Sequence, residues 1–196
     1  MAMRLVVGVT GATGAPLAAG LLEALRGDPD VRTHLVLSRW ARTTIELETG
    51  YGAREFTKLA DEVHGPGDQA ATISSGSFHT DGMVILPCSM KTVAGIRTGY
   101  ADGLIGRAAD VTLKEHRKLV LVPRETPLSE IHLENMLALA RMGAVLVPPM
   151  PAFYNHPGVV GDVVDHVVTR VLDQFGLSSS SEGRWRGLDA ARRTDS

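Results

Sequence analysis

The sequence predicts a single α/β domain built on a doubly wound, mostly parallel sheet with helices on both faces. Short apolar segments rich in Val, Leu and Ile alternate along the chain with longer segments of helical periodicity. Glycines directly follow the first apolar segment, as is typical of a tight turn from a strand into a helix. Strands that alternate with helices pair in parallel, since each helix carries the chain back across the sheet.

Length and composition set the domain organisation. The chain has 196 residues, of which 44% are hydrophobic, enough for the core of one domain. We expect that domain to span residues 1–177. Residues 178–196 are Ser-rich and then charged, and we interpret them as a loosely held C-terminal tail.

The strands are predicted first, because each is short, apolar and bounded by turn residues. The first lies just before the glycines and ends at Val9. The five predicted strands are residues 5–9, 34–37, 83–86, 119–122 and 144–147.

The helices fill the segments between these strands. Pro16 suits the first turn of a helix, and Gly50 and Gly143 are typical helix stops. The predicted helices are residues 17–25, 39–49, 91–98, 104–115, 130–142 and 162–174. Residues 51–80 are polar and Gly-rich, and only a short helix near 55–61 is expected there.

Charge and cysteine content exclude several classes of function. The formal net charge is −2, which gives no support to binding of nucleic acid or of a membrane surface. The apolar run at the N-terminus is too short for a signal peptide or a membrane span. Cys88 is the single cysteine, so no intrachain disulfide is possible, and a reducing, cytoplasmic setting is expected.

The stretch GVTGATGAP, residues 8–16, predicts a turn that can cradle a phosphate. Its glycines let backbone N–H groups approach an anion, and the following helix adds the positive end of its dipole. NADP, a flavin mononucleotide or a phosphoester would each fit such a turn, and a tight turn without a ligand is the plain alternative.

The second strand ends without the acidic residue that holds the ribose of NAD. Ser38 and Arg39 occupy that position, so NAD is disfavoured, whereas Arg39 leaves NADP open. A short-chain reductase also carries a Tyr-x-x-x-Lys pair. None of the three tyrosines has a lysine four residues later, which weighs against hydride transfer.

Two further segments gather polar residues at predicted strand ends. PCSMKT, residues 87–92, places hydroxyls and N–H groups at a helix start, where they bind anions well. Downstream, Lys114, Arg124, Tyr154 and Arg170 together suit a dianionic phosphate. Glu125 beside them would repel a phosphate, so it suggests proton transfer instead.

These segments carry a family resemblance over residues 4–177. The chain resembles the UbiX flavin prenyltransferases, which are Rossmann-like flavoproteins related to the homo-oligomeric flavin-containing cysteine decarboxylases. It is most similar to the branch encoded beside, and described as a component of, hydroxyaryl-acid or phenolic acid decarboxylase systems. The stretches that carry the resemblance are GVTGATGAP, PCSMKT, RAADVTLKE, LVPRETPLSEIHLENML, PPMPAFY and RVLDQFG.

The resemblance implies a reaction. A metal-independent prenyltransferase of this kind joins dimethylallyl monophosphate to the N5 atom of reduced FMN, releases phosphate and closes a ring at C6. The product, prenylated FMN, is the cofactor of UbiD-type aromatic acid decarboxylases. The resemblance also implies a homo-oligomer, expected to be a dodecamer.

Residue roles follow from the resemblance at the matching positions. Glu48, Glu125, Lys114 and Tyr154 are the expected catalytic residues. Trp185 is expected to cover the site. The prenyl phosphate is expected to bind Lys114, Arg124, Tyr154 and Arg170. FMN is expected to bind Gly11, Ala12, Thr13, Ser38, Cys88, Ser89, Met90, Lys91, Thr92 and Arg107.

Two alternatives stay open from the sequence. One is a non-catalytic protein that carries flavin to a hydroxyaryl-acid decarboxylase, which would have no need for a second phosphate site. The other is an NADP-dependent reductase, which lacks its tyrosine and lysine pair here.

Overall fold

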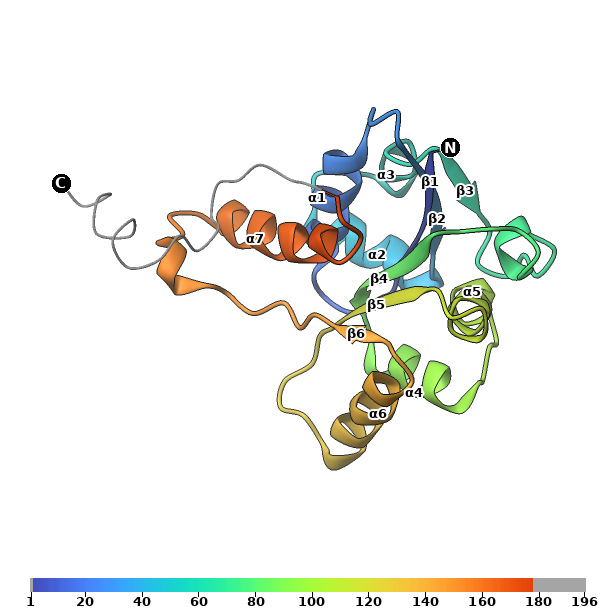
Figure 1. Cartoon of the computed structure of the whole chain (residues 1–196). Coiled ribbons are helices and arrows are strands. Elements are labelled where there is room, and N and C mark those ends of the chain that lie inside the picture. The colour runs from blue at the N-terminus through green and yellow to red at the C-terminus, as the bar shows by residue number, and fades with distance from the viewer. Residues whose placement is uncertain (1, 178–196) are drawn as a thin grey trace.

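The structure is a computed structural model that describes residues 2–177, and one parallel sheet organises them (Figure 1). Its six strands stand in the order β3-β2-β1-β4-β5-β6, and every neighbouring pair is parallel. The strands are β1 Met3–Val9, β2 Val31–Leu37, β3 Glu62–His64, β4 Gly82–Cys88, β5 Lys118–Pro123 and β6 Val145–Leu146.

Helices cover both faces of the sheet, which confirms the predicted doubly wound architecture. The first face carries α1 Ala15–Leu25, α2 Arg39–Glu48, α3 Ala53–Thr57 and α7 Val160–Asp173. The second face carries α4 Met90–Thr98, α5 Leu104–Lys114 and α6 Glu130–Arg141. Within residues 2–177 none of these helices is long and apolar enough to span a bilayer.

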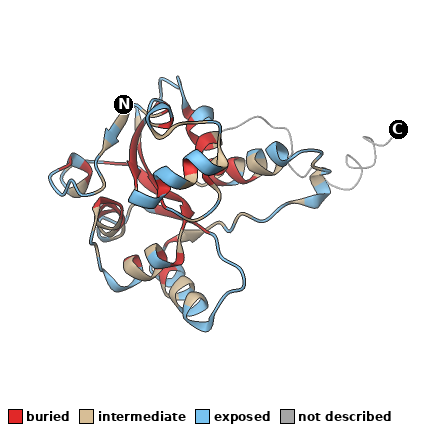
Figure 2. Cartoon of the chain, turned by 180° about the vertical axis from the view of Figure 1, so that it is seen from behind, coloured by how far each residue is buried: buried red, intermediate tan, exposed pale blue. Residues whose placement is uncertain are grey.

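The strands separate two apolar cores. Along β1, Leu5 and Val7 face the core beneath α1 and α7, whereas Val6 faces the core beneath α4 and α5. Figure 2 shows the central strands buried between the two helical layers. Burial on both faces explains why these strands are continuous apolar runs in the sequence.

Strand β3 corrects the sequence prediction for residues 51–80, where only a short helix was expected. Glu62, Val63 and His64 pair with β2 at the edge of the sheet. This strand is three residues long and has two polar members, so it carries no apolar pattern. Its pairing with β2 defines it, and local sequence cannot show that partner.

Exposed apolar side chains gather on two parts of the chain. On α6 only Leu139 is buried, while Ile131, Leu133 and Leu137 are exposed. The segment from β6 to α7 runs out from the body of the fold and exposes Phe153 (Figure 1). Apolar surface of this kind is typical of sites that another protein surface covers.

Candidate active site

A cavity opens beyond the carboxyl ends of β1 and β4, where the strand order of the sheet changes direction. Open α/β sheets bind their ligands at this place. The cavity has a volume of about 770 Å³, within the usual range for small-molecule sites. Its walls come from the loops after β1, β2 and β4, from α4, and from the segment that leads into α5.

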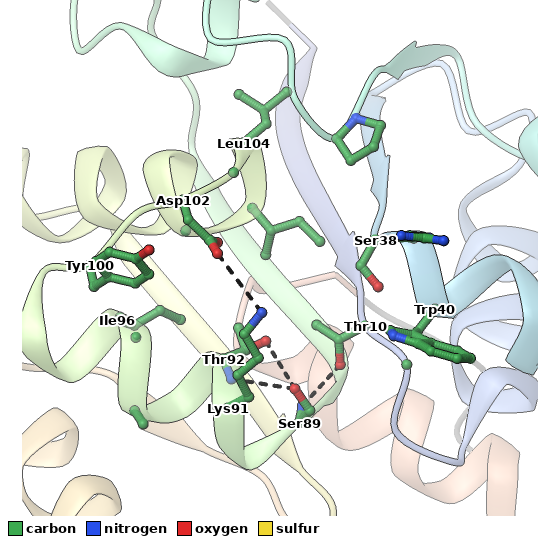
Figure 3. Close-up of a pocket in the computed structure, with 18 of the residues that line it drawn as sticks. Thr10, Ser38, Trp40, Ser89, Lys91, Thr92, Ile96, Tyr100, Asp102 and Leu104 are labelled. Carbon is green, nitrogen blue, oxygen red and sulfur yellow. Dashed lines mark hydrogen bonds and ion pairs between the residues drawn. The ribbon is translucent and has the colours of Figure 1, made fainter.

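Thr10 joins two of these loops at the floor of the cavity (Figure 3). Its hydroxyl donates to the carbonyl oxygen of Pro87 at 2.7 Å. The same hydroxyl oxygen accepts a hydrogen bond from the backbone N–H of Ser89 at 2.9 Å. Thr10 is buried, so these bonds fix the loop after β1 against the loop after β4.

Two helices begin at the cavity, and a serine caps each of them. The Ser38 hydroxyl accepts from the N–H of Ala41 at 3.2 Å at the start of α2. The Ser89 hydroxyl accepts from the N–H of Thr92 at 3.3 Å at the start of α4. Both serines were predicted to bind FMN, and both line the cavity. Two helix N-termini at one cavity favour an anionic group.

An ion pair spans the far wall. The ammonium nitrogen of Lys91 lies 3.9 Å from a carboxylate oxygen of Asp102, as Figure 3 shows. Both side chains are largely exposed, so this pair is weak and can yield to a charged ligand. Lys91 was predicted, whereas Asp102 and the neighbouring Tyr100 were missed, because neither follows a predicted strand.

Trp40 forms a wall that the sequence reasoning also missed. The residue is 71% exposed, lines the cavity and lies against Gly11. A Cβ atom on Gly11 would stand only 2.4 Å from the Cβ atom of Trp40. Glycine is therefore needed at position 11 for the loop to pass the tryptophan. The signal in the sequence was a large aromatic residue directly after a strand end.

Glu48 ties the end of α2 to the start of α1. One of its carboxylate oxygens accepts from the N–H groups of Gly14 and Ala15 at 2.8 and 2.9 Å. Burial works to raise the pKa of Glu48. The hydrogen bonds from Thr13, Gly14 and Ala15 and the charge of Arg124 outweigh it, and the pKa lies below its usual value. Glu48 is thus an ionised acceptor.

This contact changes the interpretation of the glycine-rich turn. The N–H groups at the start of α1 hold the chain's own carboxylate, Glu48, so they are not free for a ligand phosphate. The helix starts of α2 and α4 remain as the anion sites at the cavity. Gly11 lines the cavity, while Ala12 is half-buried and Thr13 is bonded to Glu48.

Arg124 and Glu125 lie where they were predicted, just past the end of β5. The backbone N–H of Arg124 donates to the carbonyl oxygen of Cys88 at 3.1 Å, which joins the ends of β5 and β4. Its charge acts on Glu48. Glu125 is exposed, and its carboxylate accepts from the N–H of Thr126 at 3.0 Å.

Tyr154 and Arg170 belong to a separate group on and beside α7. The ring of Tyr154 packs edge-on against His166, with 6.2 Å between ring centres. Arg170 is one turn further along and pairs with Asp173 at 2.9 Å. Burial and then the charge of Arg170 lower the pKa of His166, a residue that the sequence reasoning did not single out.

Lys114 lies at the opposite edge of the sheet from Arg124. It ends α5, just before β5 begins, and its ammonium group pairs with Glu115. Arg124 follows the last residue of β5, about 20 Å away along six strand residues. One chain therefore does not bring Lys114 to Arg124. The two were predicted to share a phosphate.

The remaining predicted residues have varied surroundings. Cys88 is fully buried, and burial raises the pKa of its thiol far above the usual value, so the thiol is inert and only its backbone faces neighbouring loops. Met90 is the first residue of α4 and is nearly buried. Arg107 pairs with Asp110 at 2.7 Å. Trp185 lies outside the described residues.

The lining of the cavity fits a flavin mononucleotide. Hydroxyl groups and two helix starts suit a single phosphate and a polar ribityl chain, and the exposed indole of Trp40 suits a flat aromatic ring. No acidic residue follows β2 to hold the ribose of NAD. The residues that could hold FMN are Gly11, Ser38, Ser89, Lys91 and Thr92.

Comparisons with known proteins agree with this site. The model of the Flavoprotein family matches residues 1–172. A probable UbiX-like flavin prenyltransferase of Escherichia coli O157:H7 is 72% identical over 190 residues, covering 97% of this chain and 96% of that protein. The chain belongs to the UbiX-like flavin prenyltransferases. This family membership bears out the resemblance seen in the sequence.

Two solved structures of UbiX-like proteins superpose closely on this chain. The dodecameric FMN-dependent UbiX-like decarboxylase from Escherichia coli O157:H7 has a TM-score of 0.93 at 72% identity and covers 94% of this chain and 100% of its own. AnUbiX (PadA1), in complex with FMN and dimethylallyl pyrophosphate, has a TM-score of 0.93 at 54% identity and covers 96% of this chain and 100% of its own.

Gly11→Ala should weaken FMN binding. The new methyl group would meet Trp40, and overpacking of this kind costs about 1–3 kcal/mol, or roughly tenfold or more in the dissociation constant. Flavin fluorescence titration measures it. Gly50→Ala is the matched control, because a Cβ atom there meets nothing within 4 Å. Equal FMN affinity of the two variants would contradict the proposed role of Gly11.

Glu48→Gln should destabilise the protein at pH 7 by about 2 kcal/mol, because a neutral amide replaces an ion held by N–H donors. The folded pKa of Glu48 is lowered, so its contribution is present above the ordinary glutamate pKa and is lost as pH falls below it. Urea unfolding from pH 7 to pH 4 at fixed protein concentration measures this difference.

The difference between wild type and Glu48→Gln should shrink as the pH falls. Exposed Glu46, two residues earlier on α2, provides the control variant Glu46→Gln, which should stay within about 0.5 kcal/mol of wild type at pH 7. A Glu48→Gln deficit of the same size at both ends of the pH range would argue against an ionised Glu48.

Proposed function

We propose that the protein transfers a dimethylallyl group to reduced FMN and releases phosphate, without a metal ion, forming the bond to N5 first and the ring at C6 second. The observation that carries this proposal is the cavity at two capped helix starts, with Glu48 and Arg124 at the same sheet edge. AnUbiX, of the same family, holds FMN together with dimethylallyl pyrophosphate. Prenylated FMN is the product, and a UbiD-type aromatic acid decarboxylase receives it.

FMN binds in this cavity as the prenyl acceptor. Ser38, Ser89 and Thr92 supply hydroxyls and helix-start N–H groups for its phosphate and ribityl chain. Gly11 and Ala12 allow the backbone to approach the ring, and Thr13 places a hydroxyl beside Glu48. The further FMN contacts in this proposal come from Cys88, Met90, Lys91 and Arg107.

Cationic side chains bind the phosphate of the prenyl donor. Arg124, Arg170 and Lys114, with the hydroxyl of Tyr154, neutralise the charge that develops on the leaving phosphate. Stabilising that anion makes the allylic carbon–oxygen bond easier to break. The apolar side chains and the flavin ring then shield the allylic cation from water.

A neighbouring copy of the chain supplies Lys114 in this proposal. One chain holds Lys114 and Arg124 at opposite edges of its sheet, so a site that uses both needs two chains. The exposed apolar face of α6 and the exposed segment around Phe153 offer surface for assembly. The Escherichia coli relative at 72% identity is dodecameric, and we propose the same assembly here.

Two glutamates move protons in the proposed reaction. Glu125 follows Arg124 directly and is exposed, so it can protonate the departing phosphate. Glu48 is held ionised, so it can accept a proton through Thr13 when the second ring bond forms. Released phosphate is an alternative acceptor for that proton.

The carrier function is not favoured. A carrier of flavin has no use for a second phosphate site, yet Lys114, Arg124, Glu125, Tyr154 and Arg170 are all present. The named relatives are flavin prenyltransferases. We place the enzyme in the cytoplasm, where its single cysteine stays reduced, and we assign residues 1–177 to the catalytic domain, with Trp185 in the 178–196 tail as a cover for the site.

Glu125→Gln should retain FMN and lose prenyl transfer, because an amide cannot supply the proton that the leaving phosphate needs. General acid catalysis is worth about 10²–10⁴-fold in rate, and we expect a loss in that range. Inorganic phosphate released from dimethylallyl monophosphate, in the presence of reduced FMN and without oxygen, measures it.

The control for Glu125→Gln is again Glu46→Gln, which should keep wild-type turnover. FMN affinity is measured in parallel for all three proteins, so that lost binding is not mistaken for lost chemistry. Wild-type phosphate release by Glu125→Gln would overturn the acid role.

A further inference from the structure

Three metal-ligating side chains converge on the strands at the edge of the sheet away from α7. His34 lies in the middle of β2, and Glu62 and His64 lie on β3. His34 is the register partner of Glu62, and Val36 is the partner of His64. Glu62 and His64 are two residues apart on one strand, so their side chains share a face.

The spacing of the three donor atoms matches a tetrahedral ion. Nδ1 of His34 lies 3.1 Å from Nε2 of His64 and 3.4 Å from Oε2 of Glu62. The three ligand atoms all lie within 4.8 Å of one another. Ligands about 2.05 Å from a tetrahedral Zn²⁺ stand about 3.3 Å apart, close to the two shorter distances here.

The surroundings prepare the donors for an ion. Burial lowers the pKa of His34, which keeps its ring neutral, as a metal ligand must be. Its side chain is only 1% exposed, whereas that of Glu62 is 38% exposed, so the cluster is open on the solvent side. Arg32 binds Oε1 of Glu62 at 3.1 Å and leaves Oε2 facing His34.

The ligand-free arrangement leaves a proton to be displaced. Two ring nitrogens that face each other at 3.1 Å need one hydrogen between them, since two lone pairs would repel. The rings lie within 11° of parallel. An ion that bound both nitrogens would release this proton to solvent and take two lone pairs and a carboxylate oxygen in exchange.

We propose that His34, Glu62 and His64 form a binding site for a divalent transition metal ion of the zinc type, with water as its fourth ligand. The ion would clamp the three-residue strand β3 to β2, and it takes no part in prenyl transfer. His34 stands four residues before Ser38, about 13 Å from the cavity along the strand. The proposal therefore stands or falls independently of the proposed function.

The test uses the full-length protein without an affinity tag, titrated calorimetrically with zinc chloride in chelator-free buffer at pH 7.5. We expect one Zn²⁺ per chain, proton release on binding, and weaker binding at pH 5.5 as His64 becomes protonated. Cobalt chloride is the second probe, and a tetrahedral site should give it the intense visible absorption of four-coordinate Co²⁺. Absence of saturable binding by either ion would overturn the proposal.

Variants assign the ion to the cluster. His64→Gln and Glu62→Gln should each weaken Zn²⁺ binding by on the order of tenfold or more while they keep FMN affinity. His79→Gln is the control, because His79 lies outside the cluster. Unchanged zinc affinity in Glu62→Gln, which preserves side-chain shape, would overturn the proposal even if His64→Gln failed to fold.

Discussion

The carboxylate of Glu48 at the start of α1 is the contact on which the rest of the site depends. It satisfies two N–H groups that a helix start otherwise leaves unpaired, and it joins the end of α2 to the first loop. Because these donors favour a charged oxygen, Glu48 is held ionised beside Thr13 and Arg124. One interaction thus shapes the loop and keeps an ionised carboxylate beside the site.

The sheet distributes the remaining chemistry between its two edges. At the carboxyl edge, Thr10 and Ser89 lock the loops that face the cavity, while Arg124 joins β5 to β4. At the amino edge, Lys114 ends α5. Since α5 runs antiparallel to the strands, a single chain cannot unite these groups, and assembly becomes a requirement of the proposed chemistry. The exposed face of α6 provides surface for it.

Sequence reasoning succeeded where local pattern determines structure. Apolar strands buried on both faces were predicted, and Ser38 and Ser89 were found because each directly follows such a strand. It missed β3, which exists only through pairing with β2, and Tyr100 and Asp102, which reach the cavity from positions without a strand-end signal. The position of Lys114 also escaped it, because composition and spacing do not show which edge a side chain reaches.

The central claim is that this cavity makes a new bond to flavin. The most direct measurement is the mass of the flavin extracted after wild-type protein is incubated without oxygen with reduced FMN and dimethylallyl monophosphate. The account predicts a flavin heavier than FMN by one prenyl unit. Recovery of unmodified FMN from protein that demonstrably binds both compounds would contradict it.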